Sequence, residues 1–260
     1  MRIALGIEYD GGPFSGWQTQ PGGEGVQDHL EAALSCLADA PIATITAGRT
    51  DAGVHALGQV VHFDTDVRRA EHSWVRGTNS HLNAHIRVLW AKQVSQEFHA
   101  RYGARLRTYD YLLLNDAVDA GVWKGHVGWF HLPLDVKAMQ TAVRDLVGEH
   151  DFTTFRAAQC QAASPVRTIT AAEVSQQGLI VRFSFSANAF LHHMVRNLVG
   201  SLVYIGCGKQ PAGWMAELIG ARNRGLAAPT FAPDGLYLAA VEYDAQWGLP
   251  VFPARTLPIL

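Results

Sequence analysis

The order of strand-like and helix-like segments is the feature that most restricts how this chain can fold. In each half of its 260 residues, segments with the alternation of β-strands accompany a segment with the spacing of an amphipathic helix. Apolar residues at helical spacing predict one helix over about residues 26 to 38 and a second beginning at Val136. This arrangement is typical of an α+β protein with two similar subdomains.

The expected strands cover residues 5–9, 42–46, 58–64, 88–94, 108–114 and 236–242, together with a hairpin of 168–175 and 179–186. Asn188 is a suitable cap for a third helix that runs to about Ile205, and a shorter helix is expected over 211–220. Because no low-complexity linker divides the chain, we place the boundary near residue 104. The expected subdomains are therefore 1–104 and 105–260.

Composition limits the class of protein. No apolar run reaches the length of about 18 residues that indicates a membrane-spanning helix, and the first residues lack a secretory signal, so the expected location is the cytoplasm. The three cysteines lie far apart and do not predict disulfides. The net charge of −2 does not itself indicate a nucleic-acid binder. Most of the basic residues are nonetheless Arg, which suits contacts to phosphate and bases but also follows from Arg-rich codon usage.

The segment from Ala47 to Ala56 carries the chemistry that we consider first. It follows a predicted strand and contains Asp51 between two glycines, with Arg49 two residues earlier. A neighbouring guanidinium favours the ionised form of a carboxyl group, and such a carboxylate can act as a nucleophile or stabilise positive charge on a sugar ring. From the residues alone, an Asp flanked by Gly is more often a turn residue.

Residues 48–55, Gly-Arg-Thr-Asp-Ala-Gly-Val-His, resemble the characteristic motif of the tRNA pseudouridine synthase A family. Further similar segments follow in the family's order. They are Tyr9-Asp10-Gly11 with Phe14, Gly16 and Trp17; Phe98-His99-Ala100-Arg101 with Arg107, Tyr109 and Tyr111; and residues 188–197. Together they extend over nearly the whole chain. The chain departs from the family at Leu82-Asn83, where Leu-Pro is common, and at His85.

The resemblance implies a fold of two similar subdomains joined through a mainly antiparallel central sheet flanked by helices. It also implies the isomerisation of uridine to pseudouridine at tRNA positions 38, 39 and 40, by a homodimer that uses neither a cofactor nor a metal. By this resemblance Asp51 is the catalytic carboxylate, Arg196 orients it, and the ring of Tyr109 stacks on the displaced uracil. The residues leave alternatives open, because Arg196 could reach solvent and Tyr109 and Tyr111 could form an aromatic pair in the core.

Three arginines precede the expected strand 108–114, which contains Tyr109 and Tyr111, and could contact RNA phosphates: Arg101, Arg105 and Arg107. A solvated loop without a ligand is the alternative, and Arg49 could serve the same purpose. Phe14 and Trp17 could line the site or belong to the core. Although the chain has 12 histidines, no zinc-binding motif is present, so no metal is expected.

Two other functions remain to be compared with an isomerase. A non-catalytic RNA-binding module of the same fold would not need Asp51 or Tyr109, and both are present. A glycosidase would need a second carboxyl group about 5–10 Å from Asp51, and no motif supplies one. The sequence therefore predicts an isomerase that acts on tRNA.

Overall fold

The computed structural model describes residues 1–250, which form parts of two compact units. The N-terminal unit contains Met1–Leu106 and the chain from Tyr237, and the C-terminal unit contains Arg107–Leu236. The expected boundary near residue 104 lies close to Leu106, but the expectation placed the last strand in the second subdomain. That strand, β10 (Leu236–Tyr243), pairs with β3 (His55–Asp64), and this pairing groups it with the N-terminal unit.

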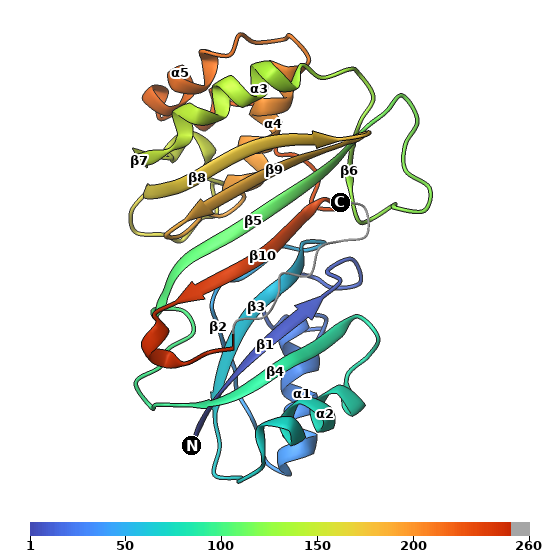
Figure 1. The fold of residues 1–260 in the computed structure, drawn as a ribbon, viewed down its shortest axis with the longest axis vertical. Coiled ribbons are helices and arrows are strands. Elements are labelled where there is room, and N and C mark those ends of the chain that lie inside the picture. The colour runs from blue at the N-terminus through green and yellow to red at the C-terminus, as the bar shows by residue number, and fades with distance from the viewer. Residues whose placement is uncertain (251–260) are drawn as a thin grey trace. The chain divides into compact units, whose positions relative to one another are not determined.

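The sheet of the N-terminal unit has the strand order β4-β1-β3-β10 (Figure 1). β1 (Arg2–Tyr9) is antiparallel to both β3 and β4 (Ile86–Val94), whereas β10 is parallel to β3. β2 (Ile45–Thr46) also pairs with β3 and is shorter than the strand expected over 42–46. The backbone N–H of Thr44 donates to the carboxylate of Glu31 (2.7 Å) instead of to a strand, which explains the late start of β2.

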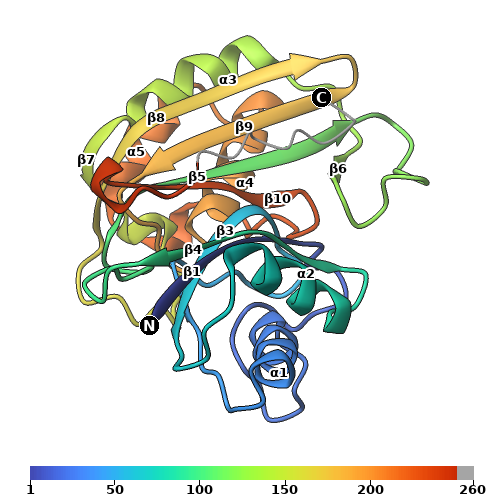
Figure 2. The same cartoon turned by 60° about the horizontal axis from the view of Figure 1, so that its bottom comes forward.

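Two helices lie on one side of this sheet, as Figure 2 shows: α1 (Val26–Ala38) and α2 (Glu71–His81). The bounds of α1 are those expected from its apolar spacing. The sequence did not predict α2, because only Trp74 and Thr78 of that helix are buried and the apolar spacing is missing. Trp74 packs edge-on against Phe63 of β3, with 5.2 Å between ring centroids.

The sheet of the C-terminal unit has the order β5-β9-β8-β7, and each neighbouring pair is antiparallel. Its strands are β5 (Ala104–Asn115), β7 (Gly148–Asp151), β8 (Val166–Gln177) and β9 (Ile180–Ala187), and β6 (Gly128–Phe130) runs parallel to β5. The expected hairpin is confirmed as β8 and β9. The short strands β6 and β7 were not expected.

The helices of the C-terminal unit are α3 (Val136–Ala142), which continues as a 3-10 turn at Val143–Leu146, α4 (Met194–Gly206) and α5 (Trp214–Ala221). The expected start of α4 at Asn188 was wrong. His193 has a left-handed backbone (φ 60°), which no helix can pass through, and the side chain of Asn188 instead accepts the backbone N–H of Thr168 (3.1 Å). The mixture of mainly antiparallel strands and few helices confirms the α+β class. In the described part of the chain, no helix is long and apolar enough to cross a membrane.

Candidate active site

Asp51 lies in the N-terminal unit, in the loop between β2 and β3. Burial alternates along this loop: Arg49 is exposed, Thr50 is buried and Asp51 is half-buried. The backbone N–H of Val54 donates to the backbone oxygen of Asp51 (3.1 Å), which closes a tight turn just before β3. The loop therefore presents Arg49 outward and holds the carboxylate of Asp51 at the surface of the unit.

Side chains of β1 and β3 hold this loop through hydrogen bonds. The hydroxyl of Tyr9 shares a buried hydrogen bond of 2.8 Å with the hydroxyl of Thr50. The carboxamide of Gln59 donates to the backbone oxygen of Gly48 (2.7 Å). Burial raises the pKa of Tyr9 to about 12, so its hydroxyl stays protonated at neutral pH. These contacts tie the loop that carries Asp51 to the strands of the sheet.

The first loop of the chain packs directly on the backbone of the Asp51 loop. Trp17 donates its backbone N–H to the backbone oxygen of Thr50 (3.0 Å). Gly16 has φ +92°, and a Cβ atom there would stand 2.9 Å from the same oxygen, so a side chain does not fit. The side chains of Phe14 and Trp17 are buried, which places them in the core and not on a substrate wall.

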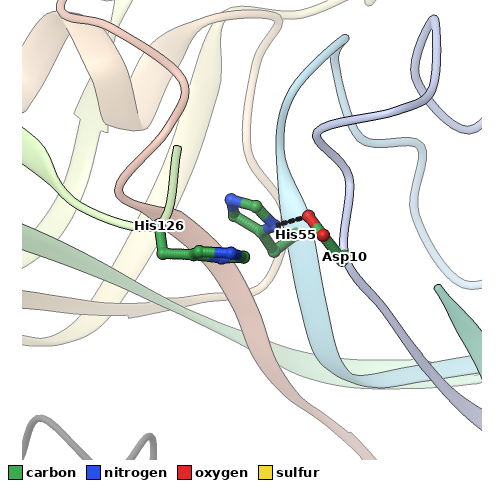
Figure 3. Close-up of side chains that lie close together, drawn as sticks. All are labelled: Asp10, His55 and His126. Atoms are coloured by element: carbon green, nitrogen blue, oxygen red, sulfur yellow. Dashed lines mark ion pairs between the residues drawn. The ribbon is translucent and has the colours of Figure 1, made fainter. Parts of the chain in front are cut away.

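A second polar pair lies where the Asp51 loop joins β3, and the sequence did not indicate it. Nδ1 of the buried His55 lies 3.1 Å from a carboxylate oxygen of Asp10 (Figure 3). The imidazole of His55 also stacks on the ring of Tyr237, with 4.6 Å between centroids. Within the N-terminal unit, Asp10 and His55 offer two ligand atoms of kinds that zinc accepts, whereas a structural zinc site uses four protein ligands. The expectation that the protein needs no metal stays a prediction.

Tyr109 and Tyr111 lie on β5 in the C-terminal unit and point to the same face, as expected. Tyr111 is fully buried and donates its hydroxyl to the backbone oxygen of Ala232 (3.0 Å), which confirms its role in the core. Tyr109 is half-buried and meets the ring of Phe190 edge-on at 5.1 Å. Of the two tyrosines, Tyr109 is therefore the one with ring surface left for a ligand.

Arg196 lies in the first turn of α4 and is half-buried. Its Nε donates to the backbone oxygen of Phe231 (2.8 Å), and the N–H of Phe231 donates back to the oxygen of Arg196 (3.2 Å). The next residue, Asn197, is fully buried and accepts hydrogen bonds from Thr230 (2.7 Å) and Arg224 (3.0 Å). The segment from Arg224 to Phe231, which accepts the hydrogen bond of Arg196, is thus itself bonded to α4 through Asn197. This limits the directions that the guanidinium of Arg196 can take.

The three arginines of the expected RNA contact differ in their surroundings. Arg101 is exposed, and its guanidinium lies 5.5 Å from the ring centroid of Tyr102. Arg105 is exposed and forms an ion pair with Asp244. Arg107 donates to the backbone oxygen of Asn188 (2.7 Å). Arg101 and Arg105 are exposed at the surface of their unit, whereas Arg107 is half-buried.

The expected site residues fall in both units. Arg49, Asp51, Arg101 and Arg105 belong to the N-terminal unit, whereas Arg107, Tyr109 and Arg196 belong to the C-terminal unit. Sequence patterns did not reveal the residues that support Asp51, because a single polar side chain in a strand does not form a repeating pattern that can be recognised. The signals that could have pointed to them were the motif residues without an assigned role, among them Tyr9, Asp10 and His55.

Comparison with known proteins defines the class. The family model described as tRNA pseudouridine synthase matches residues 6–103 and 142–244. These ranges include Asp51, Arg101 and Arg196. The chain belongs to the tRNA pseudouridine synthase family, and the resemblance inferred from its motifs is confirmed.

Relatives named tRNA pseudouridine synthase A match nearly the whole chain. The relative from Dechloromonas aromatica is 58% identical over 250 residues, which cover 96% of this chain and 95% of the relative. The relative from Paraburkholderia xenovorans is 56% identical over 257 residues and covers 99% of this chain and 95% of its own. Among solved structures, a chain of the Cbf5-Nop10-Gar1 complex is similar with a TM-score of 0.39 and 11% identity, over 91% of this chain and 48% of that chain.

Proposed function

We propose that this protein isomerises uridine to pseudouridine in tRNA, with the carboxylate of Asp51 as the catalytic group. The observation that supports this most directly is the rigid loop that holds Asp51, inside a segment matched by the family model. The relatives that match nearly the full chain carry the name of this activity. The non-catalytic RNA-binding alternative gives no reason for so many contacts to hold the loop that carries Asp51.

In the proposed reaction the bond between N1 of uracil and C1′ of ribose breaks, and a bond between C5 and C1′ forms. C5 loses its proton and N1 gains one, so substrate and product are isomers. The carboxylate of Asp51 would stabilise the sugar or base during bond cleavage, as a nucleophile or by its charge. Nothing is oxidised, so the chemistry requires no redox cofactor.

We assign Tyr109 as the surface on which the displaced uracil stacks. An enzyme that acts on a base within a paired stem must first take the base out of its stack. The half-buried ring of Tyr109, backed edge-on by Phe190, suits this purpose, and the fully buried Tyr111 does not. We assign Arg196 to orient the carboxylate and Arg49 to contact the RNA beside the displaced nucleotide.

The finer parts of the proposal follow the family. We propose that the substrate uridines are at positions 38, 39 and 40 of the anticodon arm, and that the protein works in the cytoplasm as a homodimer without a metal ion. Neighbouring target positions require recognition of RNA shape and backbone more than of base identity. Sedimentation would measure the dimer, and unchanged turnover after dialysis against a chelator would support a metal-free reaction.

The decisive experiment compares the wild type with Asp51→Asn on unmodified tRNA transcripts, with pseudouridine mapped by site. Asp51→Asn is expected to abolish the product while the Kd for tRNA stays within about threefold, a change of less than about 0.7 kcal/mol. The control is Asp39→Asn, since Asp39 is exposed at the end of α1 in a left-handed conformation that Asn also adopts. Near-normal turnover of Asp51→Asn would remove Asp51 from the mechanism.

A further inference from the structure

The segment from Phe98 to Gly103 joins β4 to β5 and is held by side chains from distant parts of the N-terminal unit. Arg2 donates to the backbone oxygens of Gln96 (2.6 Å) and Phe98 (2.8 Å) while it pairs with Asp64. The ring of Phe98 is fully buried. Arg2 and the buried ring of Phe98 therefore hold the start of this segment in place.

The peptide groups of Ala100 are bonded on both sides. Its N–H donates to Nδ1 of His62 on β3 (3.1 Å), and its oxygen accepts the hydroxyl of Tyr243 on β10 (2.6 Å). One residue earlier, Nδ1 of His99 accepts the N–H groups of Arg101 (3.2 Å) and Tyr102 (3.1 Å). Burial, followed by the charges of Arg2 and Arg101, lowers the pKa of His99 and keeps its ring a neutral acceptor.

This rigid segment ends in an exposed aromatic side chain. Tyr102 is 78% exposed, the largest exposure among the aromatic residues in the described part of the chain that lie at the surface. The ring centroids of His99 and Tyr102 lie 4.4 Å apart. The guanidinium of Arg101 lies 5.5 Å from the centroid of the Tyr102 ring. Most of the ring thus faces solvent beside a cation, and its burial contributes little to the stability of the unit.

We propose that Tyr102 is an RNA-binding residue whose ring stacks on a base or ribose of the bound tRNA outside the reacting uridine, while Arg101 contacts the adjacent phosphate. The inference rests on the tRNA substrate of the proposed function. Exposed aromatic rings among arginines are the means by which proteins hold unpaired nucleotides. Because His62, Tyr243 and His99 already order the backbone, binding does not have to order the loop.

The experiment measures the Kd of the full-length chain for an unmodified tRNA transcript at several salt concentrations. Tyr102→Ala is expected to raise the Kd about tenfold or more, which corresponds to about 1.4 kcal/mol or more. Its salt dependence should match that of the wild type, because no charge is removed. Arg101→Gln should instead make the negative slope of log K against log salt less steep by about 0.7 to 0.9.

Two matched variants separate stacking from other effects. Tyr102→Phe keeps the ring and should bind within twofold of the wild type, whereas Tyr102→Leu keeps apolar surface without a ring and should behave like Tyr102→Ala. Wild-type affinity of Tyr102→Ala or Tyr102→Leu would overturn the proposal. So would unchanged RNA affinity together with a lower mass in sedimentation, which would place Tyr102 at a protein contact.

Turnover on the same preparations distinguishes this proposal from the proposed function. If the wild type binds tRNA but forms no pseudouridine, the proposed function fails while the affinities of the Tyr102 variants still test the stacking. At saturating tRNA, Tyr102→Ala should retain the wild-type turnover number, because its ring is not assigned to the reacting nucleotide. A loss of turnover without a change in affinity would contradict the assignment.

Discussion

The imidazole of His62 accepts a hydrogen bond of 3.1 Å from the backbone N–H of Ala100, although the two residues are 38 positions apart in the chain. Because Nδ1 is the acceptor, the ring hydrogen lies on Nε2. His62 is 1% exposed, and Nε2 has no hydrogen-bond partner in the described part of the chain. A histidine near the end of β3 thus fixes the turn that carries Arg101 and Tyr102.

Replacement of His62 should show whether this hydrogen bond positions the turn for RNA. In His62→Leu the N–H of Ala100 loses its acceptor, which costs about 1–3 kcal/mol for a buried donor. His62→Asn keeps an acceptor near the position of Nδ1 and should recover much of that loss. We expect His62→Leu to raise the Kd for tRNA several-fold with little change in turnover at saturation, and His62→Asn to restore the affinity. Equal binding by both variants would mean that the bond has no part in RNA recognition.

Acid should destabilise the protein through His62. Burial, then the positive charge of Arg2, lowers the pKa of His62 from 6.5 to about 4, and the opposing effect of Asp64 is smaller. Between these values the unfolded chain binds a proton that the folded chain does not bind. The free energy of unfolding should therefore fall by about 3 kcal/mol as the pH falls from 6.5 to 4. Urea unfolding at several pH values would measure this, and His62→Asn should show a shallower fall.

The close packing of Gly16 on the Asp51 loop predicts a loss of turnover in Gly16→Ala. The substitution strains a backbone at φ +92° and pushes a methyl group against the oxygen of Thr50, next to Asp51. The strain alone costs about 1–2 kcal/mol. Gly178→Ala is the matched control, since Gly178 also has a positive φ (+58°) but its Cβ would meet no atom within 4 Å. We expect turnover to fall only in Gly16→Ala, with the Kd for tRNA unchanged in both.

Arg101, which precedes β5, and Arg105 and Arg107, which lie at its start, should contribute unequally to RNA binding. Arg101 is exposed beside the ring of Tyr102, Arg105 is exposed and paired with Asp244, and Arg107 is half-buried and donates to a backbone oxygen, so their contributions to the salt dependence should differ. Each lost phosphate contact makes the negative slope of log K against log salt less steep by about 0.7 to 0.9. Single Gln variants, compared with Arg76→Gln on the exposed face of α2, would measure the three contributions. A slope that stays at the wild-type value in all three would exclude them from the RNA contact.

The sequence could predict those elements whose burial follows a period. The bounds of α1 agree with its apolar spacing, and Tyr111 with Phe183 forms the buried face expected of β5 and β9. The helix α2 could not be predicted, because one tryptophan supplies most of its buried apolar surface. The start of α4 was misplaced because Asn188 can cap a helix but here bonds to a neighbouring strand.

The candidate site was predictable only as far as its motifs extend. Asp51 was found by its motif, whereas Tyr9, Gln59 and His62 act through contacts from strands to loops that are far away in the sequence. Such contacts depend on strand register, which composition and local spacing do not encode. The exposure of Tyr102 was equally hidden, because an exposed and a buried tyrosine look the same in a strand-turn-strand sequence.

The pairing of β10 with β3 has a consequence for biosynthesis. A ribosome releases residues 1–106 long before it makes Tyr237, so the N-terminal unit lacks one strand of its sheet while the entire C-terminal unit is translated. During that interval the open edge of β3 is available for wrong pairing. The N-terminal unit therefore cannot complete its folding before the C-terminal unit has been translated. A gene divided at the boundary between the units would encode an N-terminal fragment without β10.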